Sequence, residues 1–137
     1  MSARRAYDWL REAEEDIESA KLLLDGNQFH HACFHAQQAA EKAIKAALIA
    51  LGVFIRGHSV TILMRELSRY VTVPGELIDK VRILDQYYIP PRYPNAFDEG
   101  APADYYTKEQ AENAIMIAEE VVEFARRIIE GTLRESR

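Results

Sequence analysis

The sequence has one cysteine, one tryptophan, six glycines and no hydrophobic run long enough to cross a membrane. A single cysteine excludes an intramolecular disulfide and a zinc site built from several cysteines. Because Cys33 lies among small apolar residues in a helical pattern, we expect it to be buried rather than reactive. The most apolar stretch, residues 43–54, is interrupted by Lys45 and is shorter than the roughly 20 residues that a transmembrane helix needs.

The sequence also lacks the common signals for secretion and for glycine-rich nucleotide binding. The N-terminus has no apolar core of the length typical of a signal peptide. The chain contains no P-loop, no G-x-G-x-x-G and no G-x-S-x-G motif, so neither a glycine-rich phosphate cradle nor a serine hydrolase elbow is indicated. We therefore expect a soluble, cytoplasmic protein without a cofactor.

Positive charge is in the minority, with 17 basic and 22 acidic residues and a formal net charge of -5. Proteins that coat a phosphate backbone by bulk charge need a positive surface. Broad nucleic-acid binding is therefore disfavoured, whereas a focused basic site remains open.

What the sequence does have is helical periodicity, because apolar residues recur at three- and four-residue steps through most of the chain. No segment alternates like a strand, and the length suits one domain spanning 1–137. The expected helices begin and end at recognisable signals: Ser2 to Gly26, 28–51 before Gly52, a short helix capped by Ser59, one from Pro74-Gly75 through Tyr88 to Pro90-Pro91, and one from a Thr107–Gln110 capping box to Gly131.

The helix over 28–51 is apolar around most of its circumference, which predicts a central helix that packs against more than one other. Its core stripe is flanked by small residues that would let a neighbour approach closely. These small residues are Ala32, Ala39, Ala46 and Ala50, and the opposite, polar stripe consists of His31, His35, Gln38, Lys42 and Lys45.

Residues 89–106 are the exception to the helical pattern. Four of the five prolines lie here, and with the preceding turn so do five of the seven tyrosines. Connections in compact domains usually span about 4 to 6 residues, and longer ones are disordered or functional. Because disordered segments contain few aromatics, this loop is the first functional candidate.

Two kinds of site are suggested by these elements. His31 and His35 have the i, i+4 spacing of a metal-binding pair, but neighbouring lysines disfavour a dication, so no metal is expected. In the loop, Arg92 lies between prolines and tyrosines, where a guanidinium can contact phosphate and stack on a base. The alternative is that Arg92 only forms ion pairs with Asp98, Glu99 or Asp104.

These residues resemble a known family. The run Phe29–Ala46, which contains Gln-Gln-Ala-Ala-Glu-Lys-Ala, the Gly57-His58-Ser59 start of a helix, and the segment Tyr88–Pro94 with its Arg-Tyr-Pro are similar to the HEPN domain (higher eukaryotes and prokaryotes nucleotide-binding). The resemblance covers nearly the whole chain. It implies an all-α, up-and-down four-helix bundle with an additional short helix and a long Pro/Tyr-rich loop before the last helix, paired as a homodimer.

The resemblance also implies a setting and a chemistry. Members are often encoded beside a minimal nucleotidyltransferase, as in toxin-antitoxin pairs, and catalytic members are metal-independent ribonucleases with an arginine followed after four to six residues by a histidine. Arg92 matches that arginine and is the candidate catalytic residue, but no histidine follows it. The residues proposed to contact a nucleotide or RNA are Arg92, Tyr93, His58, Lys42 and Lys45.

Three functions therefore stay open: a nucleotide- or RNA-binding partner module, a metal-independent endoribonuclease toxin, and a structural partner subunit. In the last, family analogy implies that the nucleotidyltransferase transfers AMP to a loop tyrosine, with Tyr93, Tyr105 and Tyr106 as acceptors. Apolar residues off the core stripes are the material for the two-fold interface of the homodimer. They are Phe34, Ile49, Ile117 and Phe124.

Overall fold

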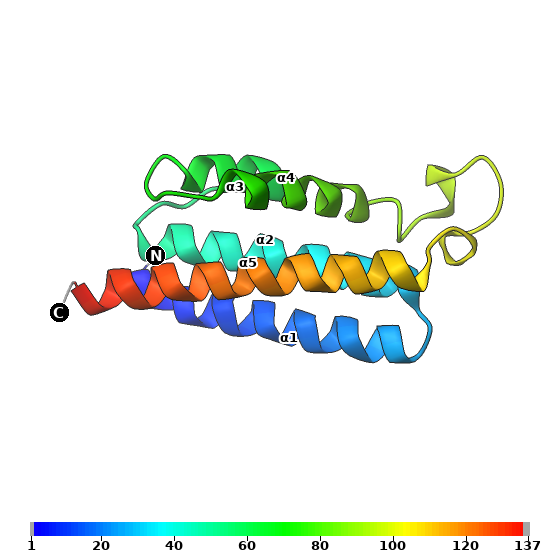
Figure 1. Cartoon of the computed structure of the whole chain (residues 1–137), viewed down its shortest axis with the longest axis horizontal. Coiled ribbons are helices and arrows are strands. Elements are labelled where there is room, and N and C mark those ends of the chain that lie inside the picture. Colours follow the sequence, from blue (N-terminus) through cyan, green and yellow to red (C-terminus); the bar gives the residue numbers. More distant parts are fainter. Residues whose placement is uncertain (1, 136–137) are drawn as a thin grey trace.

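The computed structural model describes residues 2–135, and within them five α-helices and no strand occur. The helices are α1 (Ala6–Asp25), α2 (Phe29–Ala50), α3 (Val60–Leu67), α4 (Gly75–Leu84) and α5 (Lys108–Glu135). Figure 1 shows α1, α2 and α5 side by side along the long axis of the molecule, with α3 and α4 packed along one side of them. The predicted all-α architecture is confirmed.

The central position predicted for α2 is also confirmed. This helix packs against α1, α5 and α3, and its small residues Ala32, Ala39, Ala46 and Ala50 are all buried. Alanines bring the helix axes close together because they leave little side-chain volume between the backbones. The polar stripe of α2 stays partly or fully exposed, which makes this stripe a surface on which a site can be built.

Two of the predicted helix starts, at Ser59 and at Thr107, are present with their hydrogen bonds, whereas Ser2 caps a 3-10 turn, Ala3–Arg5, and α1 begins at Ala6. The Ser59 Oγ accepts a hydrogen bond from the Ile62 amide at 3.2 Å. In the capping box, the Thr107 Oγ1 accepts from the Gln110 amide at 3.1 Å, and the Gln110 side chain accepts from the Thr107 amide at 2.9 Å. Such reciprocal bonds satisfy amides that have no partner within the helix.

Two predicted helix ends are wrong. α4 ends at Leu84 and a 3-10 turn, Asp85–Tyr87, follows it, because the Asp85 carboxylate binds the start of α3 and accepts from the Val60 amide at 2.6 Å. α5 continues past Gly131 to Glu135. Leu133 packs against the core beyond that glycine, and this burial offsets the roughly 1 kcal/mol that a glycine costs inside a helix.

Two of the four residues expected at a two-fold interface lie inside the chain instead. Ile49 is 4% and Ile117 is 3% exposed, and both belong to the hydrophobic core of the bundle. Phe34 and Phe124 are only half-buried. The homodimer itself stays a prediction, and these two isoleucines do not support it.

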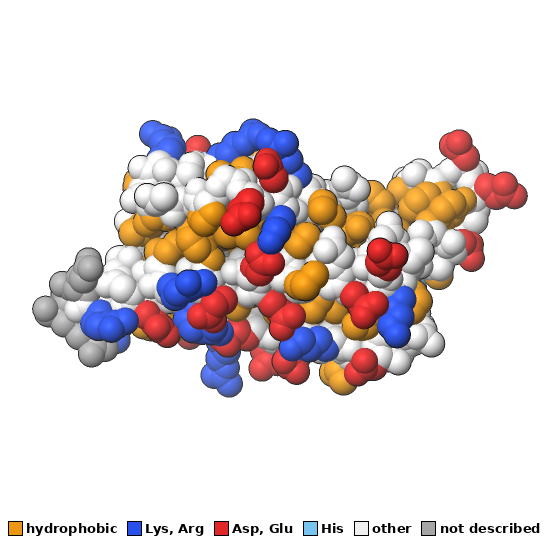
Figure 2. Space-filling view, viewed as in Figure 1, with side chains coloured by type: hydrophobic (Ala, Val, Ile, Leu, Met, Phe, Trp, Pro, Cys, Tyr) orange, Lys and Arg blue, Asp and Glu red, His pale blue; other side chains and the backbone are white. Residues whose placement is uncertain are grey.

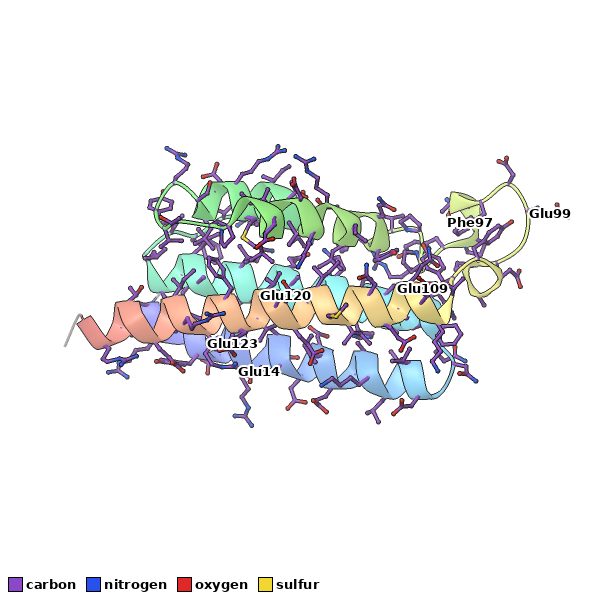
Figure 3. All side chains as sticks on the ribbon, in the orientation of Figure 1. Glu14, Phe97, Glu99, Glu109, Glu120 and Glu123 are labelled. Atoms are coloured by element: carbon purple, nitrogen blue, oxygen red, sulfur yellow. The ribbon has the colours of Figure 1, made fainter. Side chains whose placement is uncertain are left out.

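The face of the molecule formed by α1 and α5 carries interspersed acidic and basic side chains without a large patch of one sign (Figure 2). Figure 3 shows Glu14 of α1 and Glu123 of α5 where the two helices run side by side, and Arg126 forms ion pairs with both. None of the helices described is both long and apolar enough to cross a membrane.

Candidate nucleotide and RNA site

The loop before α5 is held by stacked aromatic rings. Phe97 stacks on Tyr105 with ring centres 4.2 Å apart and meets Tyr106 edge to face at 6.3 Å. Figure 3 shows Phe97 within this loop, which projects beyond the end of the bundle, and Glu99 at its outer edge. Gly100 has a φ of +80°, and a Cβ there would lie 2.9 Å from an Asp104 oxygen. The loop is therefore an ordered structure that places Arg92 at its base.

The guanidinium of Arg92 lies among three aromatic rings. Its Cζ atom is 4.5 Å from the ring centre of Phe34, 4.6 Å from that of Tyr88 and 5.2 Å from that of Tyr93. The Nε atom donates to the Tyr88 carbonyl oxygen at 2.7 Å. Cation–π contacts of this kind orient a guanidinium without neutralising its charge.

The alternative role for Arg92, an ion pair within the loop, does not occur. Asp104 instead accepts a hydrogen bond from the Ala101 amide at 2.9 Å, and within residues 2–135 no carboxylate forms an ion pair with Arg92. The positive charge of the guanidinium is therefore not balanced by an acid of the described residues. An anionic group from outside can contact its terminal nitrogens without displacing an internal partner.

His58 reaches the same aromatic surface from the loop before α3. Its ring stacks on Tyr88 with centres 4.4 Å apart and an angle of 16° between the planes. Its Nδ1 atom lies 3.1 Å from the Glu41 carboxylate. Since an ionised carboxylate only accepts hydrogen bonds, Nδ1 carries a proton, and in the neutral ring Nε2 is the acceptor. The His58 side chain is 56% exposed. The ring of Tyr88 contacts both His58 and Arg92, so the two side chains flank the same aromatic ring.

The position of His58 is fixed by buried polar groups of α2. Glu41 is 5% exposed and also accepts from the Lys45 Nζ at 3.0 Å. Gln37 is fully buried, and its amide donates to the His58 carbonyl oxygen at 2.8 Å and to Glu41 at 3.3 Å. Burying an amide and a carboxylate is favourable only when hydrogen bonds satisfy them, and here several of those bonds converge on one histidine.

A second buried carboxylate, Asp16 of α1, binds the polar stripe of α2 at other positions. Asp16 lies 3.1 Å from the His35 Nδ1 and 2.6 Å from the Lys42 Nζ. Burial acts to raise the pKa of Asp16, but the hydrogen bonds from His35 and Lys42 outweigh it and hold the pKa below its ordinary value. Lys42, predicted to contact a nucleotide, is thus engaged in joining α1 to α2.

The histidines of α2 are not grouped for a metal. Burial, together with the adjacent His31, lowers the pKa of His30, and His35 is engaged with Asp16. Among residues 2–135, no three His, Cys, Asp or Glu side chains are close enough together to hold an ion. Cys33 is fully buried, and burial raises its pKa to about 12, which keeps the thiol protonated and unreactive.

The three candidate acceptor tyrosines have different surroundings. Tyr93 and Tyr105 are both 46% exposed, but the hydroxyl of Tyr105 donates to the Glu99 carbonyl oxygen. Tyr106 is half-buried, and burial, with smaller contributions from Cys33 and Tyr87, raises its pKa to about 12. Tyr93, which contacts Arg92, is therefore the exposed one of the three whose hydroxyl forms no hydrogen bond within residues 2–135.

The structure brings together Arg92, Tyr93 and His58, and it adds residues that were not predicted as part of a site. Phe34 and Tyr88 supply the rings, and Glu41 with Gln37 positions His58. Gln37 and Glu41 stand at i, i+4 spacing with Lys45 following at the next such step, which places all three on one helix face. This i, i+4 spacing of polar residues was the sequence signal for the buried cluster. It was easily overlooked because most of the neighbouring residues are alanines.

Comparison with known proteins finds similarity to HEPN domain proteins over most of the chain. The HEPN domain model matches residues 6–128. The crystal structure of TT1696 from Thermus thermophilus is 40% identical, covers 90% of this chain and 98% of that one, and superposes with a TM-score of 0.88. ST0689, described as an archaeal HEPN homologue, is 36% identical over 91% of this chain and 98% of its own, with a TM-score of 0.77.

Two further relatives extend these similarities. The HEPN domain protein tm0613 from Thermotoga maritima is 32% identical, with 90% of this chain and 98% of that chain covered and a TM-score of 0.74. A protein of Methanocaldococcus jannaschii named "Putative toxin MJ1304" is 35% identical over 136 residues, with 93% of this chain and 87% of that protein covered.

Proposed function

The chain belongs to the HEPN domain family, and from this premise we propose that it is a nucleotide- or RNA-binding module that works as a homodimer beside a minimal nucleotidyltransferase. The observation that carries the binding role is Arg92, whose guanidinium lies on the rings of Phe34, Tyr88 and Tyr93 without a carboxylate partner in the described chain. The name "Putative toxin" of the Methanocaldococcus jannaschii relative supports a toxin-antitoxin setting.

The chemistry of this site suits a phosphate attached to a base. A guanidinium presents paired N–H donors that match two phosphate oxygens, and the neighbouring rings offer faces on which a base can stack. Because the contact is focused on one arginine and a few rings, it does not require a basic surface. It is therefore compatible with a net charge of -5.

Calorimetric titration with mononucleotides and short single-stranded RNA tests this proposal. We expect wild-type protein to bind and Arg92→Ala to lose the binding. Arg92→Lys keeps the charge but not the planar fork and should recover only part of it. Arg65→Ala, which removes an exposed arginine on α3, is the matched control and should bind normally. Absence of binding by the wild type would leave only the partner role.

The homodimer and the partner enzyme are tested separately. Light scattering should give about twice the chain mass of 15.7 kDa, and a value at the monomer mass would refute the homodimer. Co-expression with a nucleotidyltransferase encoded nearby, followed by purification through a tag on that enzyme, should recover this chain. Failure to co-purify at low salt would count against the partnership.

A second candidate function, metal-independent RNA cleavage, is favoured by the position of His58. The motif histidine is missing after Arg92, but the His58 ring stacks on the same Tyr88 that Arg92 contacts. With Nδ1 held by Glu41, its Nε2 can take the proton of a 2'-hydroxyl as that oxygen attacks the phosphorus. The bond from phosphorus to the 5'-oxygen breaks, water supplies the proton to that oxygen, and Arg92 stabilises the charge on the phosphate.

Cleavage of short RNA in the presence of EDTA tests this second function. The products would be a 2',3'-cyclic phosphate and a 5'-hydroxyl, and both Arg92→Ala and His58→Gln should abolish them. The loss of a general base is expected to cost about 100- to 10,000-fold in rate. Intact RNA at high protein concentration would exclude the ribonuclease and leave the binding role standing.

For the third function, modification of a loop tyrosine by the nucleotidyltransferase, Tyr93 is the favoured acceptor. The phenol oxygen of the acceptor attacks the α-phosphorus of ATP, its proton passes to solvent, and pyrophosphate leaves. Tyr93 is exposed and its hydroxyl forms no hydrogen bond within residues 2–135, whereas the hydroxyl of Tyr105 is bonded. Mass spectrometry after co-expression should place AMP on Tyr93, and Tyr93→Phe should remove it. An unmodified loop would count against this role.

A further inference from the structure

A pocket opens beside His58, on the side away from the loop that carries Arg92. It has a volume of about 320 Å³ and lies between the start of α1, the end of α2 and the segment 54–58 that leads into α3. The size is at the lower end of the range for small-molecule sites. It is lined by Trp9, Lys45, Ile49, Phe54, Ile55, Arg56, Gly57 and His58.

The lining combines aromatic surface with unbalanced positive charge. Trp9 is half-buried, and Phe54 is 57% exposed although it is a large hydrophobic residue. At the back, the charge of Lys45 is balanced by Glu41. Arg56 is exposed at the rim and forms no ion pair within the described chain. A flat aromatic group that carries an anion therefore fits this pocket better than an apolar or cationic ligand.

The pocket and the Arg92 site are adjacent because they share His58. This side chain lines the pocket and also stacks on Tyr88, the ring that Arg92 contacts. Aromatic and cationic side chains thus alternate along one surface: Phe54, Arg56, His58, Tyr88, Arg92 and Tyr93. This alternation is typical of grooves that bind single-stranded nucleic acid, in which bases stack on rings and phosphates meet cations.

We propose that the pocket of Trp9, Phe54 and Arg56 is a base-binding subsite for a single-stranded oligonucleotide whose backbone is held at Arg92. The proposal rests on the proposed nucleotide- or RNA-binding function and deepens it by naming the ligand as an oligonucleotide rather than a mononucleotide. One base stacks in the pocket, its phosphate contacts Arg56, and the strand passes His58 towards Arg92. A duplex does not satisfy this surface, because its bases are stacked on one another and cannot enter a pocket.

Trp9 provides a direct readout, because it is the only tryptophan in the chain. Fluorescence excited at the red edge of the tryptophan band should change when a short oligoadenylate is added. Adenosine monophosphate should bind more weakly than the oligonucleotide by about 5- to 150-fold, the usual contribution of one further stacked base. The same oligonucleotide annealed to its complement should leave the tryptophan signal unchanged.

Two exposed positions allow the pocket to be altered without disturbing the core. Phe54→Ala and Arg56→Ala should each reduce the oligonucleotide affinity and leave that of the mononucleotide at Arg92 unchanged. Their matched controls are Tyr70→Ala and Arg65→Ala, which remove an exposed aromatic residue and an exposed arginine outside the pocket. The controls should bind like the wild type. Unchanged thermal unfolding of all four variants would exclude misfolding as the cause.

The outcomes separate this subsite from the function on which it rests. The oligonucleotide could bind in an Arg92-dependent way without changing the Trp9 fluorescence, and with the same affinity in Phe54→Ala as in the wild type. In that case the subsite is refuted and the binding function stands. If the mononucleotide changes the tryptophan signal as strongly as the oligonucleotide, and Arg92→Ala does not alter this, the pocket is an independent mononucleotide site and the proposal fails. Without any binding, both fail together.

Discussion

Two buried carboxylates, Asp16 of α1 and Glu41 of α2, contact the polar stripe of α2. Each binds one histidine and one lysine, but the two histidines have different surroundings. Asp16 lies 3.1 Å from a histidine Nδ1 and 2.6 Å from a lysine Nζ. Glu41 lies 3.1 Å from a histidine Nδ1 and 3.0 Å from a lysine Nζ. In each cluster the histidine is positioned by an acid that is itself withdrawn from solvent.

The difference lies in where the histidine comes from. His35 belongs to α2 itself, and its side chain is 33% exposed, so the Asp16 cluster joins one bundle helix to another. His58 belongs to a loop, is 56% exposed and stacks on the ring that Arg92 contacts. A carboxylate, a histidine and a lysine thus hold two helices together in the Asp16 cluster. In the Glu41 cluster, we infer, the same three groups hold an exposed histidine in position at the binding site. Residue types alone do not distinguish a structural cluster from a functional one.

Removing the acid of the second cluster should have the largest effect. Glu41→Ala leaves Lys45, whose side chain is 13% exposed, without its partner. Breaking a buried ion pair in this way typically costs about 3 to 5 kcal/mol of the free energy of unfolding. Denaturant unfolding measures the loss. We expect the same variant to lose oligonucleotide binding, because His58 is no longer held.

Glu41→Gln separates the two effects. The amide keeps an oxygen that can accept from the His58 Nδ1, so most of the binding should remain while part of the stability is lost. If Glu41→Gln and Glu41→Ala reduce binding equally at temperatures where both are folded, positioning through a hydrogen bond is not the role of Glu41.

Removing the acid of the first cluster should have a smaller effect and act on stability only. Asp16→Asn keeps the shape but loses the charge that pairs with Lys42 and His35. Both partners are more exposed than Lys45, so we expect a loss of about 1 to 3 kcal/mol. Oligonucleotide titration of the folded variant should give the wild-type affinity. A loss of affinity would mean that the two clusters are not separate.

Much of the fold could be predicted from the sequence, because helical periodicity and capping residues are local signals. Ser59 and the Thr107–Gln110 box lie at the helix starts they predicted. The end of α4 could not be predicted, since it depends on Asp85 reaching the start of α3 from a distant part of the chain. Gly131 was misinterpreted because a local breaker signal was outweighed by the burial of Leu133.

The site was predictable only in part, for the same reason. Arg92 stands out in a loop rich in proline and tyrosine, but its aromatic partner Phe34 comes from α2. His58 was a candidate as one of the few basic residues, whereas its support from Gln37 and Glu41 depends on the packing of a loop against a helix. Lys42 and Lys45 follow the same polar stripe and nevertheless bind different carboxylates.

Acid should weaken the Asp16 cluster in a way that a variant can resolve. The pKa of Asp16 is held below its ordinary value in the folded protein, which for an unfolded aspartate is about 3.9. Its contribution to stability is therefore complete above about pH 4 and is lost as the pH falls through the lower, folded-state pKa. Unfolding measured from neutral pH down to about pH 2 should decline less steeply in Asp16→Asn than in the wild type. Parallel curves would contradict the pKa shift.

The smallest change in stability is expected from His58→Gln, and this makes it the sharpest test of the comparison. The side chain is more than half exposed, and surface substitutions typically change the free energy of unfolding by no more than about 0.5 kcal/mol. His35→Gln in the first cluster should also be mild, because Asp16 keeps its ion pair with Lys42. The two variants should differ in binding: His58→Gln removes the ring that stacks on Tyr88, whereas His35→Gln leaves the proposed strand path intact. Equal oligonucleotide affinities for both variants would show that the exposed histidine, like the less exposed one, only holds the fold together.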